Sequence, residues 1–252
     1  MLTVTDMTVR YGELTIVERA GFSVSEGQWV MMVGPNGAGK STIINAISQG
    51  IPYTGTVQYE DSDIARMKPA QIARRIGVLT QSHHVAYSFT VEEIVKLGRY
   101  CYSPGIFDAM TQEDAERVQN ALEITGMTPF KNQSVLTLSG GELQRAFLAQ
   151  LFAQNPNMLI LDEPANHLDL VYQKQIFELI GRWLKEPRRA VLSVVHDLSL
   201  ARAYGTHAVL LDKGRVVSCG ALRDVVTRDK LCEIYNMDVY GWMQSMLSQW
   251  ER

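Results

Sequence analysis

The sequence predicts an α/β fold in which a parallel strand core is interrupted by a helical insert. Apolar runs typical of buried strands alternate with helical patterns before residue 82 and after residue 155, while residues 82–155 keep only helical patterns. A glycine-rich loop directly follows one of the apolar runs, at residues 34–42. Strands that alternate with helices in this way are typical of a parallel sheet with crossover helices.

The composition excludes several functional classes. Hydrophobic residues make up 46% of the 252 residues and charged residues 20%, which is typical of a globular domain, and the formal charge of −3 argues against a nucleic-acid partner. The three cysteines are widely spaced without a C-x-x-C pair, so we expect neither a disulfide framework nor a zinc knuckle. A chain of this kind is expected to work in a reducing compartment. The first ten residues lack the pattern of a signal peptide. No apolar run approaches the roughly 20 residues of a membrane span, so any membrane role is expected to come through a partner.

The N-terminal segments are expected to pair as antiparallel strands. Residues 2–11 and 15–24 have alternating patterns and flank a turn. The apolar run at residues 30–33 then leads into the glycine-rich loop, and residues 42–49 continue as a helix. Before the insert we expect a strand at 55–59, a helix at 69–75 and a strand at 76–80.

The helical insert and the segments after it complete the expected fold. Capping boxes predict helix starts at Thr90 and Ser139, and Thr111 precedes a third helix that ends near Gly126. Beyond Pro156 strands and helices alternate again. The expected strands are 158–162, 190–195, 208–212 and 215–218, and the expected helices are 169–184 and one through Ala203.

The glycine-rich loop matches G-x-x-x-x-G-K-[ST], the P-loop pattern that binds nucleoside triphosphates. Glycines allow consecutive backbone N–H groups to wrap a phosphate, and the following helix turns its positive end toward the anion. Lys40 supplies charge to the β- and γ-phosphates, while the Ser41 hydroxyl is placed to bind Mg²⁺. The residues expected to contact the nucleotide are Gly34, Pro35, Asn36, Gly37, Ala38, Gly39, Lys40, Ser41 and Thr42.

Two further segments carry candidate chemistry. The apolar run 158–161 ends in Asp162, which can hold Mg²⁺, and Glu163, which can orient or deprotonate an attacking water. Taken alone, these acids could be a solvated strand end. Residues 138–145, LSGGELQR, form a helix N-terminus that could bind a second anion, although a plain capping box is the alternative.

Four motifs together resemble those of the ATP-binding cassette (ABC) ATPases. They are GPNGAGKST at 34–42, LSGGELQ at 138–144, LILDEP at 159–164 and VVHD at 194–197, and the resemblance runs from Leu2 to about Tyr240. It implies a P-loop NTPase core with an N-terminal antiparallel β-subdomain and an inserted α-helical subdomain. The implied boundaries are a single ABC ATPase domain at 1–240, with a core of about 1–81 and 156–220, a helical subdomain of about 82–155, and a tail at 241–252.

The resemblance also implies a head-to-tail dimer around two Mg²⁺-bound ATP molecules. In such a dimer Ser139, Gly140, Gly141 and Glu142 of one chain would face the γ-phosphate bound by its partner, and the loop 166–169, which includes Asp169, would touch the other subunit. Ala165 departs slightly from the family, in which Thr or Ser is more usual after the proline. The remaining implied roles are adenine stacking for Tyr11, contact with Mg²⁺ and water for Gln81, hydrolysis for Glu163, and γ-phosphate contact for His196.

Alternatives remain open for some of these residues. Tyr11 could instead be a core aromatic, and a glutamine at a strand end is commonplace, so the role of Gln81 depends on the resemblance. Glu163 separates a hydrolysing ATPase from a non-hydrolysing regulatory cassette, because members without hydrolysis often lack this acid.

Within the family, the chain is most similar to the ATPases of importers for iron siderophores, haem, cobalamin and related metal chelates. Residues 78–81, 90–100, 146–150 and 231–239 carry this similarity. It implies a polytopic permease, an external substrate-binding protein and a peripheral location on the cytoplasmic face of the cell membrane. The alternative is a soluble ABC ATPase that drives a cytosolic process such as iron–sulfur cluster assembly; a ribosome factor is less consistent with a single P-loop.

Two features are not assigned a role by the family. His83 and His84 fall in the segment expected to receive a membrane partner, where they could be a polar surface or a metal site. Residues 242–250 place apolar side chains on one stripe of a helix, which we expect to pack on the chain's own core, with a subunit contact as the alternative.

Overall fold

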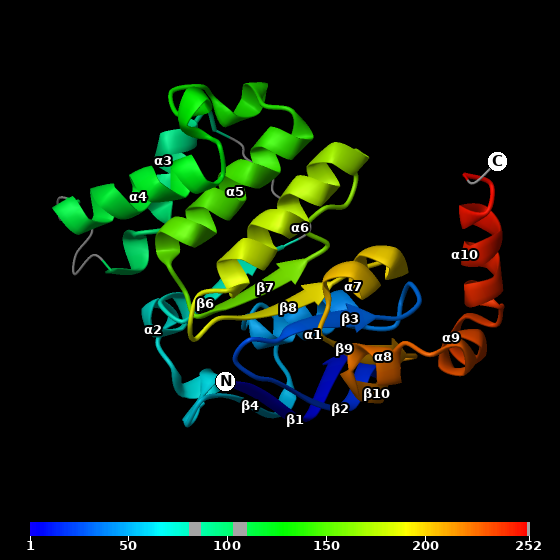
Figure 1. The fold of residues 1–252 in the computed structure, drawn as a ribbon. Helices are drawn as coiled ribbons and strands as arrows, with labels where there is room; N and C mark the ends of the chain where they lie inside the picture. The colour runs from blue at the N-terminus through cyan, green and yellow to red at the C-terminus, as the bar shows by residue number, and fades with distance from the viewer. Residues whose placement is uncertain (81–86, 103–109, 251–252) are drawn as a thin grey trace. The chain divides into compact units, whose positions relative to one another are not determined.

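The computed structural model describes residues 1–80, 87–102 and 110–250. The chain divides into two compact units, and Figure 1 labels the helices and strands of both. Unit 1 comprises residues 1–63 and 194–252, and unit 2 comprises residues 64–193. Among the described residues no helix is long and apolar enough to cross a membrane.

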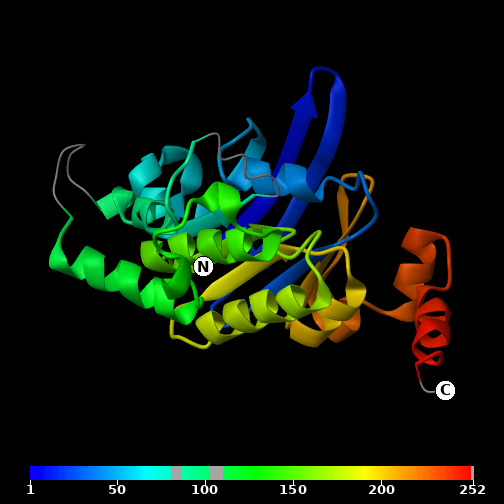
Figure 2. The same cartoon turned by 90° about the horizontal axis from the view of Figure 1, so that it is seen from above.

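Unit 1 contains the expected N-terminal antiparallel sheet. Its strand order is β2-β1-β4-β5, and β1 pairs antiparallel with both β2 and β4. Apolar side chains of β1, among them Leu2, Met7 and Val9, are buried, while several intervening residues are exposed, so one face of the sheet covers the core. Figure 2 shows the β1–β2 pair as a long hairpin. The strands are β1 (Leu2–Tyr11), β2 (Leu14–Val24), β4 (Thr54–Tyr59) and β5 (Ser62–Asp63).

A second set of strands in unit 1 supports the glycine-rich loop. All five residues of β3 (Trp29–Val33) are buried, as an apolar run before a P-loop predicts. It pairs in parallel with β9 (His207–Asp212), which pairs antiparallel with β10 (Arg215–Ala221). The helices of unit 1 are α1 (Lys40–Ile47), α7 (Leu198–Tyr204), α8 (Leu222–Val225), α9 (Arg228–Tyr235) and α10 (Val239–Leu247).

The C-terminal helix α10 differs from the expectation that its apolar stripe packs on the core. Val239 is its only buried residue, whereas Trp242 is 53% exposed and Trp250, just beyond the helix, is 86% exposed. An ion pair between Arg228 and Asp238 ties the start of α10 to α9, and Asp238 also caps α10 through the Gly241 N–H. Both ribbon views show α9 and α10 projecting away from the strands of their own unit (Figures 1 and 2). The stripe therefore remains largely uncovered within unit 1.

Unit 2 carries the other strands and the helical insert. Strands β6 (Ile76–Leu79), β7 (Met158–Asp162) and β8 (Ala190–Val194) lie in the order β8-β7-β6, and β6 and β7 are parallel. Along the chain, helix α2 (Pro69–Ala73) precedes β6, and helix α6 (Leu170–Leu184) lies between β7 and β8. Short 3₁₀ turns cover Ile64–Arg66, Tyr100–Tyr102, Thr128–Phe130 and Val135–Thr137.

The helical insert consists of α3 (Val91–Leu97), α4 (Gln112–Ile124) and α5 (Gly140–Gln154), and both α3 and α4 contact α5. Each helix begins with a complete capping box, at Thr90, Thr111 and Ser139. The predicted helix starts at Thr90 and Ser139 are therefore confirmed. The reciprocal hydrogen bonds of these boxes satisfy N–H groups that a helix start otherwise leaves unpaired.

A nearly buried ion pair holds the insert together. The Arg99 Nε lies 2.8 Å from the Asp114 Oδ1, and their side chains are only 7% and 14% exposed. Arg99 also donates to the Ala153 carbonyl of α5, at 2.9 Å. Hydrogen bonds from the Thr111 hydroxyl and from Arg99 hold the pKa of Asp114 below its usual range. The pair joins the residues after α3 to both α4 and α5.

Candidate nucleotide-binding and hydrolysis site

In unit 1 the glycine-rich loop connects the end of β3 to the start of α1, as the sequence predicts. Gly34 has φ +151°, and a Cβ at this position would lie 2.2 Å from the Leu211 carbonyl oxygen of β9. Gly39 has φ +94° and is the N-cap of α1. A side chain at position 34 would overlap the backbone of β9, and the φ of Gly39 is one that other residues rarely adopt, so both positions favour glycine.

The N-terminus of α1 has the features of an anion site. Gly39 provides no side-chain cap, and the first turn contains no acidic residue. Lys40 is only 5% exposed and donates to the carbonyls of Gly34, at 2.7 Å, and Pro35, at 2.9 Å, so its charge is held against the loop. Ser41 lies in the first turn of the same helix. The positive end of the helix dipole and a lysine held against the loop fit a polyphosphate.

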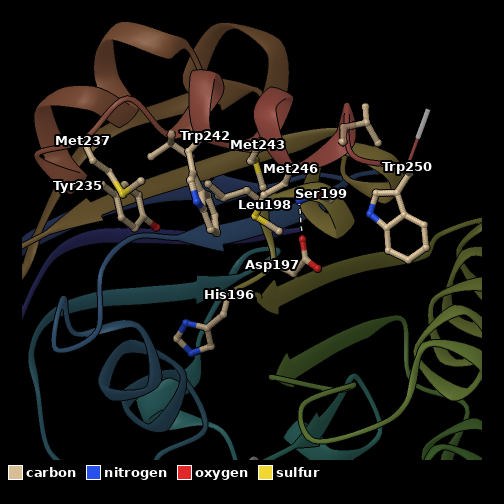
Figure 3. A pocket seen from close by; sticks show the side chains of 12 residues that line it. His196, Asp197, Leu198, Ser199, Tyr235, Met237, Trp242, Met243, Met246 and Trp250 are labelled. Atoms are coloured by element: carbon tan, nitrogen blue, oxygen red, sulfur yellow. Dashed lines mark hydrogen bonds between the residues drawn. The ribbon is translucent and has the colours of Figure 1, made fainter. Parts of the chain in front are cut away.

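Two more predicted residues of unit 1 are exposed. Tyr11 ends β1 with 53% of its surface exposed, so the alternative of a core aromatic is wrong. His196 follows the end of β8, where the Val195 N–H donates to the Met32 carbonyl of β3 at 3.3 Å. Asp197 then caps α7 through the Ser199 N–H at 2.7 Å. Figure 3 shows the His196 ring directed away from the apolar side chains of α10.

The two acids at the end of β7 lie in different surroundings in unit 2. Asp162 ends the strand and is 5% exposed, whereas Glu163 lies just beyond it with φ +53°, a backbone conformation that non-glycine residues rarely adopt. The Asn166 Nδ2 donates to the Glu163 Oε2 at 2.5 Å. The Gln144 Nε2 of α5 donates to the Pro164 carbonyl at 2.7 Å. The sequence analysis did not anticipate either contact, and the second joins residues 20 positions apart, which no local pattern indicates.

Ser139–Glu142 form the predicted helix N-terminus at the start of α5. The Ser139 hydroxyl and backbone N–H both donate to the Glu142 carboxylate, at 2.7 and 2.8 Å, and hold the pKa of Glu142 below its usual range. A Cβ at Gly141 would lie 2.4 Å from the Tyr172 Cγ of α6. Packing against Tyr172 therefore explains why position 141 is a glycine, whether or not a ligand binds there.

Asp169 caps α6 by accepting from the Tyr172 N–H at 3.0 Å, so its carboxylate has a structural contact in its own unit. Gln81, His83 and His84 lie outside the described residues. Across the described part of the chain, no group of three or more His, Cys, Asp or Glu side chains could hold a metal ion. The predicted residues thus form two sets. Unit 1 holds Tyr11, residues 34–42 and His196, and unit 2 holds Ser139–Glu142, Asp162, Glu163 and Asp169.

Comparisons with known proteins identify the family of this chain. The sequence profile of the ABC transporter family matches residues 17–166. The chain is 36% identical to the ferric enterobactin transport ATP-binding protein FepC of Escherichia coli (strain K12), over 92% of this chain and 85% of that protein. It is also 36% identical to the hemin import ATP-binding protein HmuV of Jannaschia sp. (strain CCS1), over 93% of this chain and 87% of that protein.

The solved structures agree on the fold. A dimeric ATP-binding cassette in a post-hydrolysis state, bound to ADP and Pi, superimposes with a TM-score of 0.76 at 27% identity and covers 88% of this chain and 99% of its own. The predicted fold class is confirmed by this likeness. The resemblance to metal-chelate importer ATPases is likewise confirmed by the relatives. This chain is an ATPase of the ABC transporter family.

Proposed function

We propose that this chain is the ATP-hydrolysing subunit of an importer for a metal chelate of the iron siderophore, haem or cobalamin type. It would work at the cytoplasmic face of the membrane as a head-to-tail dimer beneath a polytopic permease, which an external binding protein supplies with substrate. The observation that carries the choice of cargo is the similarity along more than nine-tenths of this chain to proteins named for enterobactin transport and hemin import.

The P-loop geometry supports the proposed binding of ATP. Helix α1 begins directly after the glycine-rich loop with no acidic residue in its first turn, and Lys40 holds its charge against the same loop. Tyr11 is exposed and can stack on a base. We assign to these residues the binding of the triphosphate and the adenine.

Hydrolysis is assigned to Glu163, with His196 and Gln81 contacting the γ-phosphate and the attacking water. Glu163 is less buried than Asp162, and the Asn166 amide donates to its Oε2, so the carboxylate that would orient or deprotonate the water is held in place. Gln144 supports the same loop through Pro164. We place Asn166 and Gln144 as positioning residues for Glu163.

The residues proposed to bind Mg²⁺ provide oxygen atoms, which suit that ion. Ser41 provides a hydroxyl in the first turn of α1, and Asp162 provides a buried carboxylate; oxygen donors of this kind are those that Mg²⁺ prefers. Gln81 is the third proposed ligand. Bound Mg²⁺ would neutralise charge that develops on the phosphate oxygens.

We assign binding of the γ-phosphate held by the partner chain to the N-terminus of α5. Ser139 and Gly140 are exposed there, and the helix presents its positive end. Asp169 lies on the loop proposed to touch the other subunit. Replacing Ser139 by arginine would place a long cation where this phosphate is proposed to sit, so Ser139→Arg should abolish ATP-dependent dimers while leaving nucleotide binding by the P-loop intact.

An exposed aromatic surface in unit 2 supports docking of the permease. Tyr87, Leu97 and Tyr100 are 72%, 50% and 61% exposed around α3, and the rings of Tyr87 and Phe89 meet edge to face with centroids 6.3 Å apart. Contiguous exposed apolar side chains mark sites of protein association. The surface falls between Gln81 and Tyr102, the segment that the family resemblance implies for contact with a membrane partner.

Reconstitution tests the importer function. The chain is placed in liposomes with the permease of its own gene neighbourhood, and ATP hydrolysis is measured with and without the loaded binding protein. Hydrolysis should rise when the loaded binding protein is present. Leu97→Asp should remove this stimulation without changing hydrolysis by the isolated chain, and Leu136→Asp, at another exposed leucine, is the control. Purification only with soluble cluster-assembly proteins would favour the cytosolic alternative.

A further inference from the structure

The last residue of helix α9, Tyr235, lies next to the nucleotide loop of its own unit. Its side chain is half-buried and lines a hollow of about 630 Å³ in unit 1, and His196, proposed to contact the γ-phosphate, lines the same hollow. Figure 3 shows both side chains around this hollow. The motifs that carry the nucleotide chemistry lie elsewhere in the chain, so the sequence assigns no role to this tyrosine.

A hydrogen bond joins the Tyr235 hydroxyl to the backbone of Gly34, the first glycine of the P-loop. Burial raises the pKa of the Tyr235 hydroxyl, and this hydrogen bond opposes the rise. Only a group that donates to the phenol oxygen favours its charged form. The backbone group is therefore the Gly34 N–H, which donates to the tyrosine.

Gly34 is thus held at three of its groups. Its N–H donates to Tyr235, and its carbonyl accepts from the Lys40 Nζ at 2.7 Å. Its Cα packs so tightly against β9 that a Cβ would lie 2.2 Å from the Leu211 carbonyl oxygen. Two hydrogen bonds that share one residue therefore connect Tyr235 to Lys40, the side chain that supplies charge to the phosphates.

Helix α9 is anchored on both sides of Tyr235. Leu231 and Ile234 are buried, with 1% and 8% of their surfaces exposed, and attach the helix to unit 1. Arg228, at the start of α9, donates from its Nε to the Asp238 Oδ1 at 3.1 Å and from its second guanidinium nitrogen to the other carboxylate oxygen. This pair joins the start of the helix to the residues just after its end. The tyrosine is therefore presented to the loop from an anchored helix.

We propose that Tyr235 is a positioning residue for the P-loop, which holds Gly34, and through it Lys40, in the geometry that receives the β-phosphate. Lys40 donates to the carbonyls of Gly34 and Pro35. A phosphate that draws the ammonium group toward itself weakens these ties, whereas the bond to Tyr235 remains. A loop held in its binding conformation in advance loses less freedom when the nucleotide binds. This inference rests on the assignment of the triphosphate to this loop under the proposed function.

Calorimetric titration of the full chain with ADP and Mg²⁺ tests the proposal, since ADP is not hydrolysed during the measurement. Tyr235→Phe removes the hydroxyl and keeps the ring. The dissociation constant for ADP should rise about 3–10-fold, the usual effect of losing one hydrogen bond. Tyr240→Phe is the matched control, because it makes the same change at a half-buried tyrosine of α10 whose ring faces Arg202. Its affinity should equal that of the parent chain.

A double-mutant cycle with Lys40→Ala separates positioning from a general structural role. If Tyr235 acts through Gly34 on Lys40, Tyr235→Phe should change the affinity less than about twofold once Lys40→Ala is present. A structural role of the ring or of α9 would give the same factor with and without Lys40→Ala. The coupling between the two substitutions is therefore the decisive measurement.

Each outcome has one interpretation. A loss in Tyr235→Phe, no loss in Tyr240→Phe and a smaller effect in the presence of Lys40→Ala would support the positioning role. Unchanged affinity in Tyr235→Phe, or an equal loss in both backgrounds, would overturn it. Failure of the proposed nucleotide site would appear separately, as a Lys40→Ala variant that binds ADP as tightly as the parent chain does.

Discussion

Glu163→Gln isolates the chemical step from folding and from nucleotide binding. The glutamine keeps one side-chain oxygen, which can accept from the Asn166 amide as Glu163 does, over the 2.5 Å separation seen here. Its backbone would face the same φ of +53°, so the strain of this position is unchanged. We therefore expect the melting temperature and the affinity for ATP to stay close to those of the parent chain.

The expected loss of rate follows from what the carboxylate does. A positioned general base contributes about 10²–10⁴-fold, so hydrolysis should slow by that factor, which corresponds to about 3–5 kcal/mol of barrier. Because hydrolysis separates the proposed sandwich, Glu163→Gln should also accumulate as an ATP-bound dimer. Adding Ser139→Arg to this variant should remove the dimer.

The assay combines phosphate release in single-turnover conditions with gel filtration in ATP. Glu178→Gln is the matched control, since it makes the same chemical change at a 49% exposed side chain of α6. Its rate should equal that of the parent chain. Hydrolysis by Glu163→Gln at the parent rate would refute the role of Glu163 and the sandwich mechanism that depends on it.

Three further variants test the supports of the site. Lys40→Ala should lower the affinity for ATP at least about tenfold in calorimetry, because a buried charge against the P-loop is lost; unchanged affinity would exclude the assigned anion site. Asp114→Asn should lower the free energy of unfolding by about 3 kcal/mol at pH 7 in urea titrations, because Arg99 loses its partner. Since the folded pKa of Asp114 is lowered, this stabilisation is complete above its unfolded pKa and disappears as the pH falls through the folded pKa, so the variant and parent should converge in acid. Gly141→Ala should lower stability by about 1–3 kcal/mol by thermal melting, and Tyr172→Leu should restore part of it if the ring is the obstacle.

The sequence predicted the parts of the site that have local rules. The P-loop is such a case, because glycine spacing, a preceding strand and a following helix are all visible along the chain. Strand β3 and helix α5 were placed correctly for the same reason, since apolar runs and capping boxes involve residues near each other in sequence. Helix α1 begins at Lys40, two residues before the predicted start, because the left-handed Gly39 already serves as its cap.

Contacts between distant segments could not be predicted in this way. Gln144 reaches the Pro164 carbonyl across 20 positions, and the ring of Tyr172 fills the space beside Gly141. The apolar stripe of α10 was recognised as helical, but periodicity gives only which residues share a face. Whether that face is covered depends on the path of the chain, and the path leaves it exposed.

The hydrogen bond from Gln144 to Pro164 has a consequence for two sites in a dimer. Ser139, proposed to face the partner's phosphate, caps the start of α5, and Gln144 of the same helix holds the loop of its own Glu163 through Pro164. A shift of this helix when the partner binds ATP would thus reach the acid that acts on the chain's own ATP. In a symmetric pair the same path runs in both directions, so occupancy of each site would be communicated to the other. Positive cooperativity in ATP hydrolysis, weakened by Gln144→Ala, is the behaviour that this connection implies.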